Sequence, residues 1–294
     1  MMRPTRLLPC VLLALASCAP ESEPQSGSEP IGAAKTAALK LYVFDCGRVR
    51  FDDEQLDAFD FGLTSEETDV RVLIASCYVV EHERGLLLWD GGLPLATADT
   101  EGWQDADGKE LRLDRRLGDQ LAEIGLDFTA FDYVAFSHMH YDHVGVANEV
   151  EGATLLIQGP EYEAAFADEI TVYGYRPALY ERLRNADRQI LDGEHDVFGD
   201  GRVRILPAPG HTPGHQMLFV DLAETGPVLL SGDLYHFQFN RDNRRVPSIN
   251  VDAEMTLASM DRIEKFVEES GAELWIQHEL KRFEKIEQAP AYNQ

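Results

Sequence analysis

The sequence holds little positive charge, few cysteines and only a short apolar run at its start. Its 294 residues include 26 Lys and Arg against 52 Asp and Glu, which gives a formal net charge of −26. Such an acidic chain repels phosphate groups, so nucleic acids and anionic lipid surfaces are poor candidate partners. Of the four cysteines, maturation would leave two, which are too few for a scaffold built on disulfides. A globular class remains, because 44% of the residues are apolar and can bury a full core.

The short apolar run, Leu7 to Ala16, follows two arginines. It has about half of the roughly 20 residues that a membrane-spanning helix needs, so it predicts an export signal over residues 1–17. The letters LASC at its end resemble the lipobox of bacterial lipoproteins, which implies cleavage before Cys18 and acylation of that cysteine. A plain secretory signal with a chance cysteine is the alternative. We expect an exported protein of the periplasm or cell envelope, with membrane contact only through the lipid anchor.

Residues 18–38 are rich in Pro, Ser and Glu and show no periodicity, which predicts a flexible tether. Residues 39–294 then form the folded domain. Maturation as a lipoprotein would leave Cys46 and Cys77 as the remaining thiols. In an oxidising compartment they pair if their strands are neighbours, and otherwise they are two separately buried thiols.

From residue 40 onward the pattern predicts one α/β domain. Runs of β-branched and aromatic residues predict strands over 39–47, 70–82, 85–92, 133–136, 154–158, 202–207, 216–222, 227–233 and 273–277. Apolar residues at helical spacing predict a helix from Leu113 to Ile124 that ends at Gly125, and a longer helix over 253–269. The letters FGDG, residues 198–201, predict a hairpin turn.

Polar side chains follow four of these strands at the point where each strand ends. The residues are His138, His211, Asp233 and His278. A rigid sheet holds such loops in place and can aim side chains from distant sequence positions at one point. We therefore expect the four side chains to converge.

The stretch FSHMHYDHVG, residues 136–145, is the densest of these clusters. His138 and His140 are two apart and face one direction on an extended segment, while Asp142 and His143 follow at a turn. Imidazole and carboxylate are ligands that divalent metals such as zinc select. A solvated polar loop is the alternative, but the H-x-H-x-D-H pattern indicates two ligands to each of two metals.

The motifs SHMHYDHVG, PAPGHTPGHQ, LLSGDLYH and LWDGG, in their order and spacing, resemble the metallo-β-lactamase superfamily. Within it the resemblance is closest to the N-acyl-homoserine lactonases and covers residues 40–285. It implies an α/β fold, an αββα sandwich of two mixed β-sheets flanked by helices. It also implies two divalent metal ions, with zinc favoured, and Asp90 of LWDGG would orient their ligands. One metal would be held by His138, His140 and His211 and the other by Asp142, His143 and His278, with Asp233 as the bridge.

The same resemblance implies a reaction. A hydroxide that bridges the metals would attack the carbonyl of a small lactone or ester, above all an N-acyl-homoserine lactone, as in quorum quenching. Asp142 would protonate the leaving alkoxide. In the lactonases a tyrosine a few positions after the bridging aspartate stabilises the oxyanion. This favours Tyr235 here, although His236 occupies the third position after Asp233.

Other functions stay open at this point. The metals could serve a β-lactam, a thioester or another ester, or the protein could be a redox or non-catalytic metal-binding lipoprotein. A serine hydrolase is disfavoured because the sequence has no G-x-S-x-G motif. His82, His195 and His236 fall outside the motifs and are expected to be structural or surface residues. His215 is expected to support its loop. An apolar cleft for an acyl chain could be lined by Tyr162, Phe166, Tyr173, Tyr175, Tyr180, Phe237 and Phe239.

Overall fold

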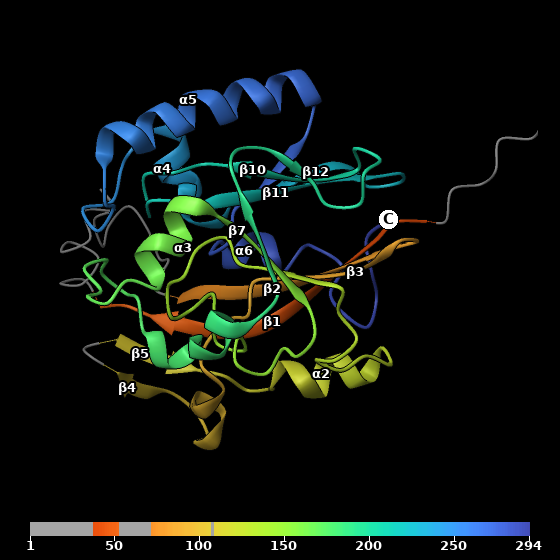
Figure 1. The fold of residues 1–294 in the computed structure, drawn as a ribbon, viewed down its shortest axis with the longest axis vertical. Coiled ribbons are helices and arrows are strands. Elements are labelled where there is room, and N and C mark those ends of the chain that lie inside the picture. The colour runs from red at the N-terminus through yellow and green to blue at the C-terminus, as the bar shows by residue number, and fades with distance from the viewer. Residues whose placement is uncertain (1–37, 53–71, 107–108) are drawn as a thin grey trace, which may run out of the picture. The chain divides into compact units, whose positions relative to one another are not determined.

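The computed structural model (Figure 1) describes three stretches of the chain, residues 38–52, 72–106 and 109–294. The expected signal and the expected acylation site, Cys18, lie outside the described residues, as does nearly all of the expected tether. Among the described residues, no helix combines the length and the apolar character that crossing a membrane requires.

Eight strands of the described chain form the first sheet. They are β1 (Lys40–Arg50), β2 (Val72–His82), β3 (Gly85–Trp89), β4 (Gln104–Ala106), β5 (Lys109–Arg112), β6 (Tyr133–Ala135), β7 (Thr154–Gln158) and β8 (Arg188–Leu191). Their order is β4-β5-β1-β2-β3-β6-β7-β8. The pairs from β4 to β3 are antiparallel, whereas β3, β6, β7 and β8 run parallel to one another. Parallel strands place their carboxyl ends at one edge, which is where the polar loops begin.

Five further strands form the second sheet. They are β9 (His195–Asp196), β10 (Val203–Pro207), β11 (Gln216–Leu222), β12 (Gly226–Leu230) and β13 (Glu273–Trp275). Their order is β13-β12-β11-β10-β9, with one parallel pair, β12 and β13. Both sheets are therefore mixed. The described strands up to β8 all belong to the first sheet and those from β9 onward to the second.

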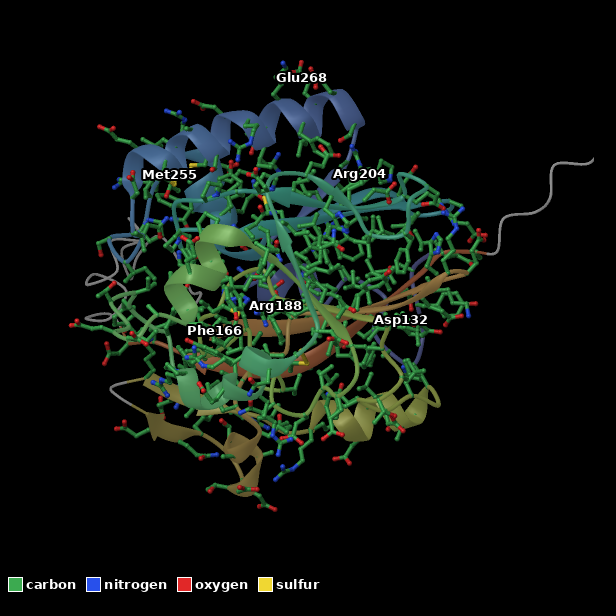
Figure 2. The ribbon with its side chains drawn as sticks, in the orientation of Figure 1. Asp132, Phe166, Arg188, Arg204, Met255 and Glu268 are labelled. Atoms are coloured by element: carbon green, nitrogen blue, oxygen red, sulfur yellow. A yellow bond between two sulfur atoms is a disulfide. The ribbon has the colours of Figure 1, made fainter. Side chains whose placement is uncertain are left out.

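The helices are α2 (Leu117–Glu123), α3 (Gly159–Ala165), α4 (Gln238–Asp242), α5 (Ala253–Ser270) and α6 (Leu280–Phe283). Short 3-10 turns cover η1 (Leu95–Asp99), η2 (Pro177–Leu179), η3 (Glu181–Asn185) and η4 (Gly232–Leu234). The longest helix, α5, begins where the Asp252 side chain accepts a hydrogen bond from the Met255 N–H, and ends at Gly271 with a φ of 69°. Figure 2 shows Met255 and Glu268 near opposite ends of this helix.

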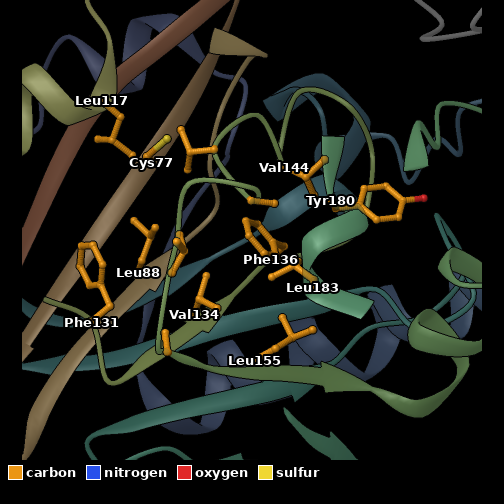
Figure 3. Close-up of a cluster of buried hydrophobic side chains, with 14 of the residues drawn as sticks. Cys77, Leu88, Leu117, Phe131, Val134, Phe136, Val144, Leu155, Tyr180 and Leu183 are labelled. Carbon is orange, nitrogen blue, oxygen red and sulfur yellow. The ribbon is translucent and has the colours of Figure 1, made fainter. Parts of the chain in front are cut away.

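The core lies in three layers. Side chains between the sheets, such as Leu41, Trp89 and Leu218, pack face to face. Met260 of α5 packs with the outer face of the second sheet, and Leu117 of α2 packs with the outer face of the first (Figure 3). The predicted αββα sandwich is thus confirmed, since each sheet buries one face on the other and one on helices.

The structure settles one prediction that the sequence left open, the pairing of two cysteines, and corrects another, the start of a helix. Cys46 of β1 and Cys77 of β2 form a disulfide, which is possible because the two strands are neighbours. The predicted helix from Leu113 begins instead at Leu117. The pairing of β5 with β1 keeps the chain extended as far as Arg112, so Leu113 is buried in a loop ahead of the helix.

Candidate metal centre

The seven expected ligands come together at one end of the sandwich, although they come from four separate loops. The loop after β6 carries the H-x-H-x-D-H motif, and the loops after β10, β12 and β13 each add one side chain. The ligand atoms form two groups, and within each group they lie within 4.8 Å of one another. The groups are His138, His140, His211 and Asp233, and Asp142, His143 and His278.

Asp233 connects the two groups through its two carboxylate oxygens. Its Oδ2 lies 3.3 Å from Nε2 of His211 and 3.7 Å from Nε2 of His138. Its Oδ1 lies 3.3 Å from Nε2 of His143 and 3.0 Å from Nε2 of His278. Each oxygen therefore faces one group, which is the arrangement of a carboxylate that bridges two cations.

The residues fit a pair of divalent metals. Within the described residues, His143 Nε2 and Asp233 Oδ1 are buried and make no hydrogen bond, which leaves both atoms for another partner. Burial, with neighbouring imidazoles, holds the pKa values of His138 and His140 well below the usual range. Both rings are therefore neutral near pH 7, the state that binds metal. Imidazole and carboxylate donors without thiolate suit zinc and related ions.

Contacts behind the ligands fix the orientation of their rings. Asp90 lies with Oδ2 3.2 Å from Nδ1 of His143, and its Oδ1 accepts a 2.7 Å hydrogen bond from the Ser137 N–H. Asp90 thus orients a ligand, as expected from LWDGG. Burial lowers the pKa of His143, but the Asp233 and Asp90 carboxylates more than offset it and raise the pKa well above the usual range. These partners raise the basicity of the ring toward a metal.

Two supports were not predicted. His211 Nδ1 lies 2.9 Å from Oδ1 of Asn250, and His278 Nδ1 lies 2.8 Å from the carbonyl oxygen of Ile74. Both partners come from segments distant in sequence, and neither stands in a recognisable motif. No signal in the sequence points to them.

The comparisons with known proteins agree with this geometry. The profile of the metallo-beta-lactamase superfamily matches residues 70–269 of this chain. This chain belongs to that superfamily. AttM, an N-acyl homoserine lactonase of Azorhizobium caulinodans, is 30% identical over 227 residues, which cover 73% of this chain and 85% of AttM. An N-acyl homoserine lactonase of a Bacillus species is 28% identical over 259 residues, which cover 86% of this chain and 98% of the relative.

A solved structure of an N-acyl homoserine lactone hydrolase has the same fold. It holds the product N-hexanoyl-L-homoserine at its catalytic metal centre, and it is 27% identical to this chain with a TM-score of 0.73. The match covers 87% of this chain and 99% of that one. The family and fold that the motifs predicted for this metallo-β-lactamase superfamily member are confirmed.

His236 was expected to be a structural or surface residue of this superfamily member, but it lies inside the metal centre. The residue is only 4% exposed, and its Nε2 lies 3.1 Å from Oδ2 of Asp233. Its ring is stacked on His278 and lies edge-on to His211. The sequence signal was its position three residues after Asp233.

Tyr235, the expected oxyanion donor, points elsewhere. Its hydroxyl donates a 2.9 Å hydrogen bond to Oε1 of Glu264, and its ring packs in the cluster under α5. The backbone of Tyr235 is extended, with φ −135° and ψ 126°, so the side chains of Tyr235 and His236 leave on opposite sides. The residue that faces Asp233 is therefore His236, and this geometry does not support the oxyanion role of Tyr235.

The other histidines of this superfamily member behave differently from one another. His215 is buried beside the site, and its Nε2 accepts a 2.8 Å hydrogen bond from the Asp233 N–H. His82 is buried against Phe198 and is structural. His195 lies partly exposed in β9. The expected loop support by His215 agrees with these contacts.

A cleft opens over the ligands. Its floor is formed by His140, Asp142, Asp233, His236 and His278. Its walls include Phe51, Leu73, Tyr141, Tyr173 and Ile249. A hollow of about 300 Å³ adjoins it, with Tyr175 in its wall. Of the aromatic residues expected to line a cleft, Tyr173 and Tyr175 do so, whereas Tyr180 and Phe237 are buried in the core.

Proposed function

We propose that this protein is a dinuclear metal-dependent hydrolase that opens the ring of N-acyl-homoserine lactones, the chemistry of quorum quenching. The observation that carries the proposal is the carboxylate of Asp233, whose two oxygens face two separate groups of buried imidazoles. The names of the relatives support the substrate, and one structural neighbour holds an N-acyl-homoserine product at its metal centre.

The metals are proposed to be zinc. His138, His140 and His211 would hold one ion, Asp142, His143 and His278 the other, and Asp233 would contact both. Such a pair of divalent ions supplies hydroxide near neutral pH and withdraws electrons from a carbonyl. The nitrogen and oxygen donor set supports zinc, although it also accepts iron, manganese and cobalt.

Asp142 is the proposed proton donor to the leaving alkoxide. It lies at the floor of the cleft, and it is less buried than the histidines around it. A carboxylate has two oxygens, so one stays available for a proton when the other binds metal. The group that protonates the departing oxygen must reach the reacting bond, and the exposed side of Asp142 meets that need.

His236 is proposed to donate a hydrogen bond to the oxyanion, the role first expected of Tyr235. It lies at the open side of the centre, beside Asp233 and inside the cleft. Burial lowers the pKa of His236, so its ring is neutral near pH 7 and carries one N–H. With that proton on Nε2, 3.1 Å from Oδ2 of Asp233, the N–H would become available to the oxyanion when this oxygen binds metal. A donor aimed at developing negative charge in a buried site contributes strongly to the rate.

The walls of the cleft suit an acyl chain. Phe51, Leu73 and Ile249 are apolar, and Tyr173 presents a ring that is 56% exposed. Apolar walls with a few polar groups at one end are typical of small-molecule sites. An amide-linked chain would lie against them while its lactone carbonyl faces Asp233.

The decisive experiment joins metal analysis to a substrate panel on one protein sample. We expect two metal ions per chain and hydrolysis of acyl-homoserine lactones in preference to β-lactams, thioesters and phosphate esters. A sample with two metals that leaves a series of acyl-homoserine lactones intact would contradict the proposed substrate. Preferred cleavage of a thioester or a β-lactam would replace it.

We also propose that the mature protein is exported and anchored through Cys18. Support comes from the short apolar run and the LASC letters that end it. Radiolabelled palmitate should label the wild-type protein and should not label Cys18→Ser. An unlabelled wild type in the soluble periplasmic fraction would instead indicate a plain secretory signal.

A further inference from the structure

Glu161 carries a buried carboxylate that lies behind the metal centre and is not one of its ligands. It belongs to α3 and is 1% exposed. Burial raises the pKa of its carboxyl, while hydrogen bonds from its neighbours act in the opposite direction. A charge in such a place is costly unless donors surround it, so its partners define its role.

Four donors converge on this carboxylate. Its Oε1 accepts from the Met139 N–H at 2.8 Å and from the Tyr175 hydroxyl. Its Oε2 accepts from Thr212 Oγ1 at 2.8 Å and from the Gly214 N–H at 2.9 Å. An ionised carboxylate only accepts, and it therefore matches four donors. The contact is close, because a Cβ on Gly214 would lie 2.4 Å from the backbone nitrogen of Glu161.

Each donor belongs to a segment that carries or backs a ligand of the first group. Met139 lies between the two histidines of the H-x-H pair, and Thr212 directly follows His211. The ring of Tyr175 lies edge-on to His140, with the ring centroids 5.6 Å apart. One side chain thus holds the H-x-H segment, the His211 loop and the ring behind His140 together.

The second group rests on other supports. His143 is held through Asp90, and His278 through the carbonyl of Ile74. The four donors to Glu161 take part in neither of these contacts. The two halves share one contact, the Ser137 hydroxyl, whose Oγ lies 3.1 Å from Nδ1 of His138 and 3.0 Å from Nδ1 of His143. The four bonds of Glu161, by contrast, reach only segments of the first group.

We propose that Glu161 is a positioning residue that sets the metal affinity of the first group, His138, His140 and His211, and leaves the second group unaffected. It acts through the two backbone segments and Tyr175, which fix the spacing of the three imidazoles. Loss of a partner behind metal ligands weakens metal binding by about 10- to 100-fold. The proposal rests on the metal centre of the proposed function and does not depend on the lactone substrate.

The test measures zinc affinity by isothermal titration calorimetry, in which zinc is titrated into protein stripped of metal by a chelator. Glu161→Gln keeps the size of the side chain but turns one accepting oxygen into a donor that opposes two of the four donors. It is compared in two backgrounds, His278→Ala, which keeps the first group, and His211→Ala, which keeps the second. We expect about 10- to 100-fold weaker binding in the first background and less than about threefold change in the second.

Two controls keep the test decisive. Glu163 lies on the exposed side of the same helix, so Glu163→Gln should leave the zinc affinity unchanged in both backgrounds. Thr212→Val removes one donor and should reproduce part of the effect if Glu161→Gln does not fold. Equally weaker zinc binding in both backgrounds would overturn selective positioning and indicate a general loss of structure. Unchanged zinc binding in both backgrounds would overturn the proposal as well. Failure to hydrolyse lactones would leave this result unaffected.

Discussion

The backbone N–H of Asp233 donates a 2.8 Å hydrogen bond to Nε2 of His215. Nδ1 of the same ring lies 3.0 Å from the carbonyl oxygen of Ala208, so one neutral tautomer makes both bonds. Burial lowers the pKa of His215 to about 3, with neighbouring His211 adding to the effect. The turn before Asp233 is tight as well, because Gly232 has a φ of 48° and a Cβ there would lie 2.5 Å from His215 Nε2.

His215→Phe should loosen this support. Phenylalanine fills a similar volume but offers no nitrogen to the Asp233 N–H, so the bridging carboxylate loses its fixed position. We expect metal affinity to fall about 10- to 100-fold, measured by zinc titration of stripped protein. His195→Gln, in the partly exposed strand β9, is the matched control and should bind metal normally. Unchanged affinity in His215→Phe would show that its ring is not needed for positioning.

Asp233→Asn should remove the bridge. The amide keeps the shape but loses the charge and replaces one oxygen by a donor that points at imidazole nitrogens. We expect most of the metal and more than about 100-fold of the activity to be lost. Metal analysis and lactone turnover on the same sample check this. A variant with normal turnover would contradict the bridging role.

His236→Phe and Tyr235→Phe should separate two neighbouring roles. Removal of the His236 N–H should lower kcat about 100- to 1000-fold with two metals still bound. Tyr235→Phe loses only the hydrogen bond to Glu264, so it should cost about 1 kcal/mol of unfolding free energy and little activity. Steady-state kinetics, metal analysis and urea unfolding distinguish them. A large loss of kcat in Tyr235→Phe, with little change in His236→Phe, would assign the oxyanion role to Tyr235 instead.

Reduction of the Cys46–Cys77 disulfide should lower stability. The bond closes a loop with a sequence separation of 31, which corresponds to about 3 to 4 kcal/mol in the chain-entropy picture. Cys46→Ala/Cys77→Ala should unfold at correspondingly lower denaturant and should be insensitive to reductant. If dithiothreitol leaves the unfolding midpoint of the wild type unchanged, the two thiols do not pair in solution.

Asp200→Asn should alter the dependence of stability on pH. Burial opposes the charge of Asp200, but hydrogen bonds from Arg202 and His82 more than offset it and lower the pKa to about 2. The folded pKa lies below the unfolded one, so the charge stabilises the fold above about pH 4, and this contribution is lost as pH falls toward about 2. In urea unfolding of metal-free protein, the variant should be about 1 kcal/mol less stable at pH 7 and equal near pH 2. A constant difference across this range would contradict the assignment.

Long apolar runs were readable from the sequence. The strands Thr154–Gln158 and Gln216–Leu222 have the predicted bounds, because each is a continuous apolar stretch that ends at turn residues. Strands β4, β5 and β8 were missed, and two of them, β4 and β8, form the edges of the first sheet. Arg188–Leu191 is mostly exposed and has no alternating pattern, so only its pairing with β7 makes it a strand. Such pairing is a tertiary effect that local propensity does not reveal.

The seven ligand residues were readable for a different reason, since their types and spacing carry the chemistry. The residues around them were not. His236 lies beside Asp233 because an extended backbone sends it to that side, and Glu161 reaches two loops only after the fold has formed. A single sequence states which groups can bind a cation, and it does not state which groups hold them still.

The chain passes between the two sheets in one short segment, since β8 ends at Leu191 and β9 begins at His195. A peptide bond cut at Gly193, inside that segment, would yield two fragments with one sheet each. The N-terminal fragment would contain the H-x-H-x-D-H cluster, and the C-terminal fragment would contain His211, Asp233 and His278. Each cation would then draw donors from both pieces, so the ions would link the two halves of a nicked molecule in addition to the apolar contacts between the sheets.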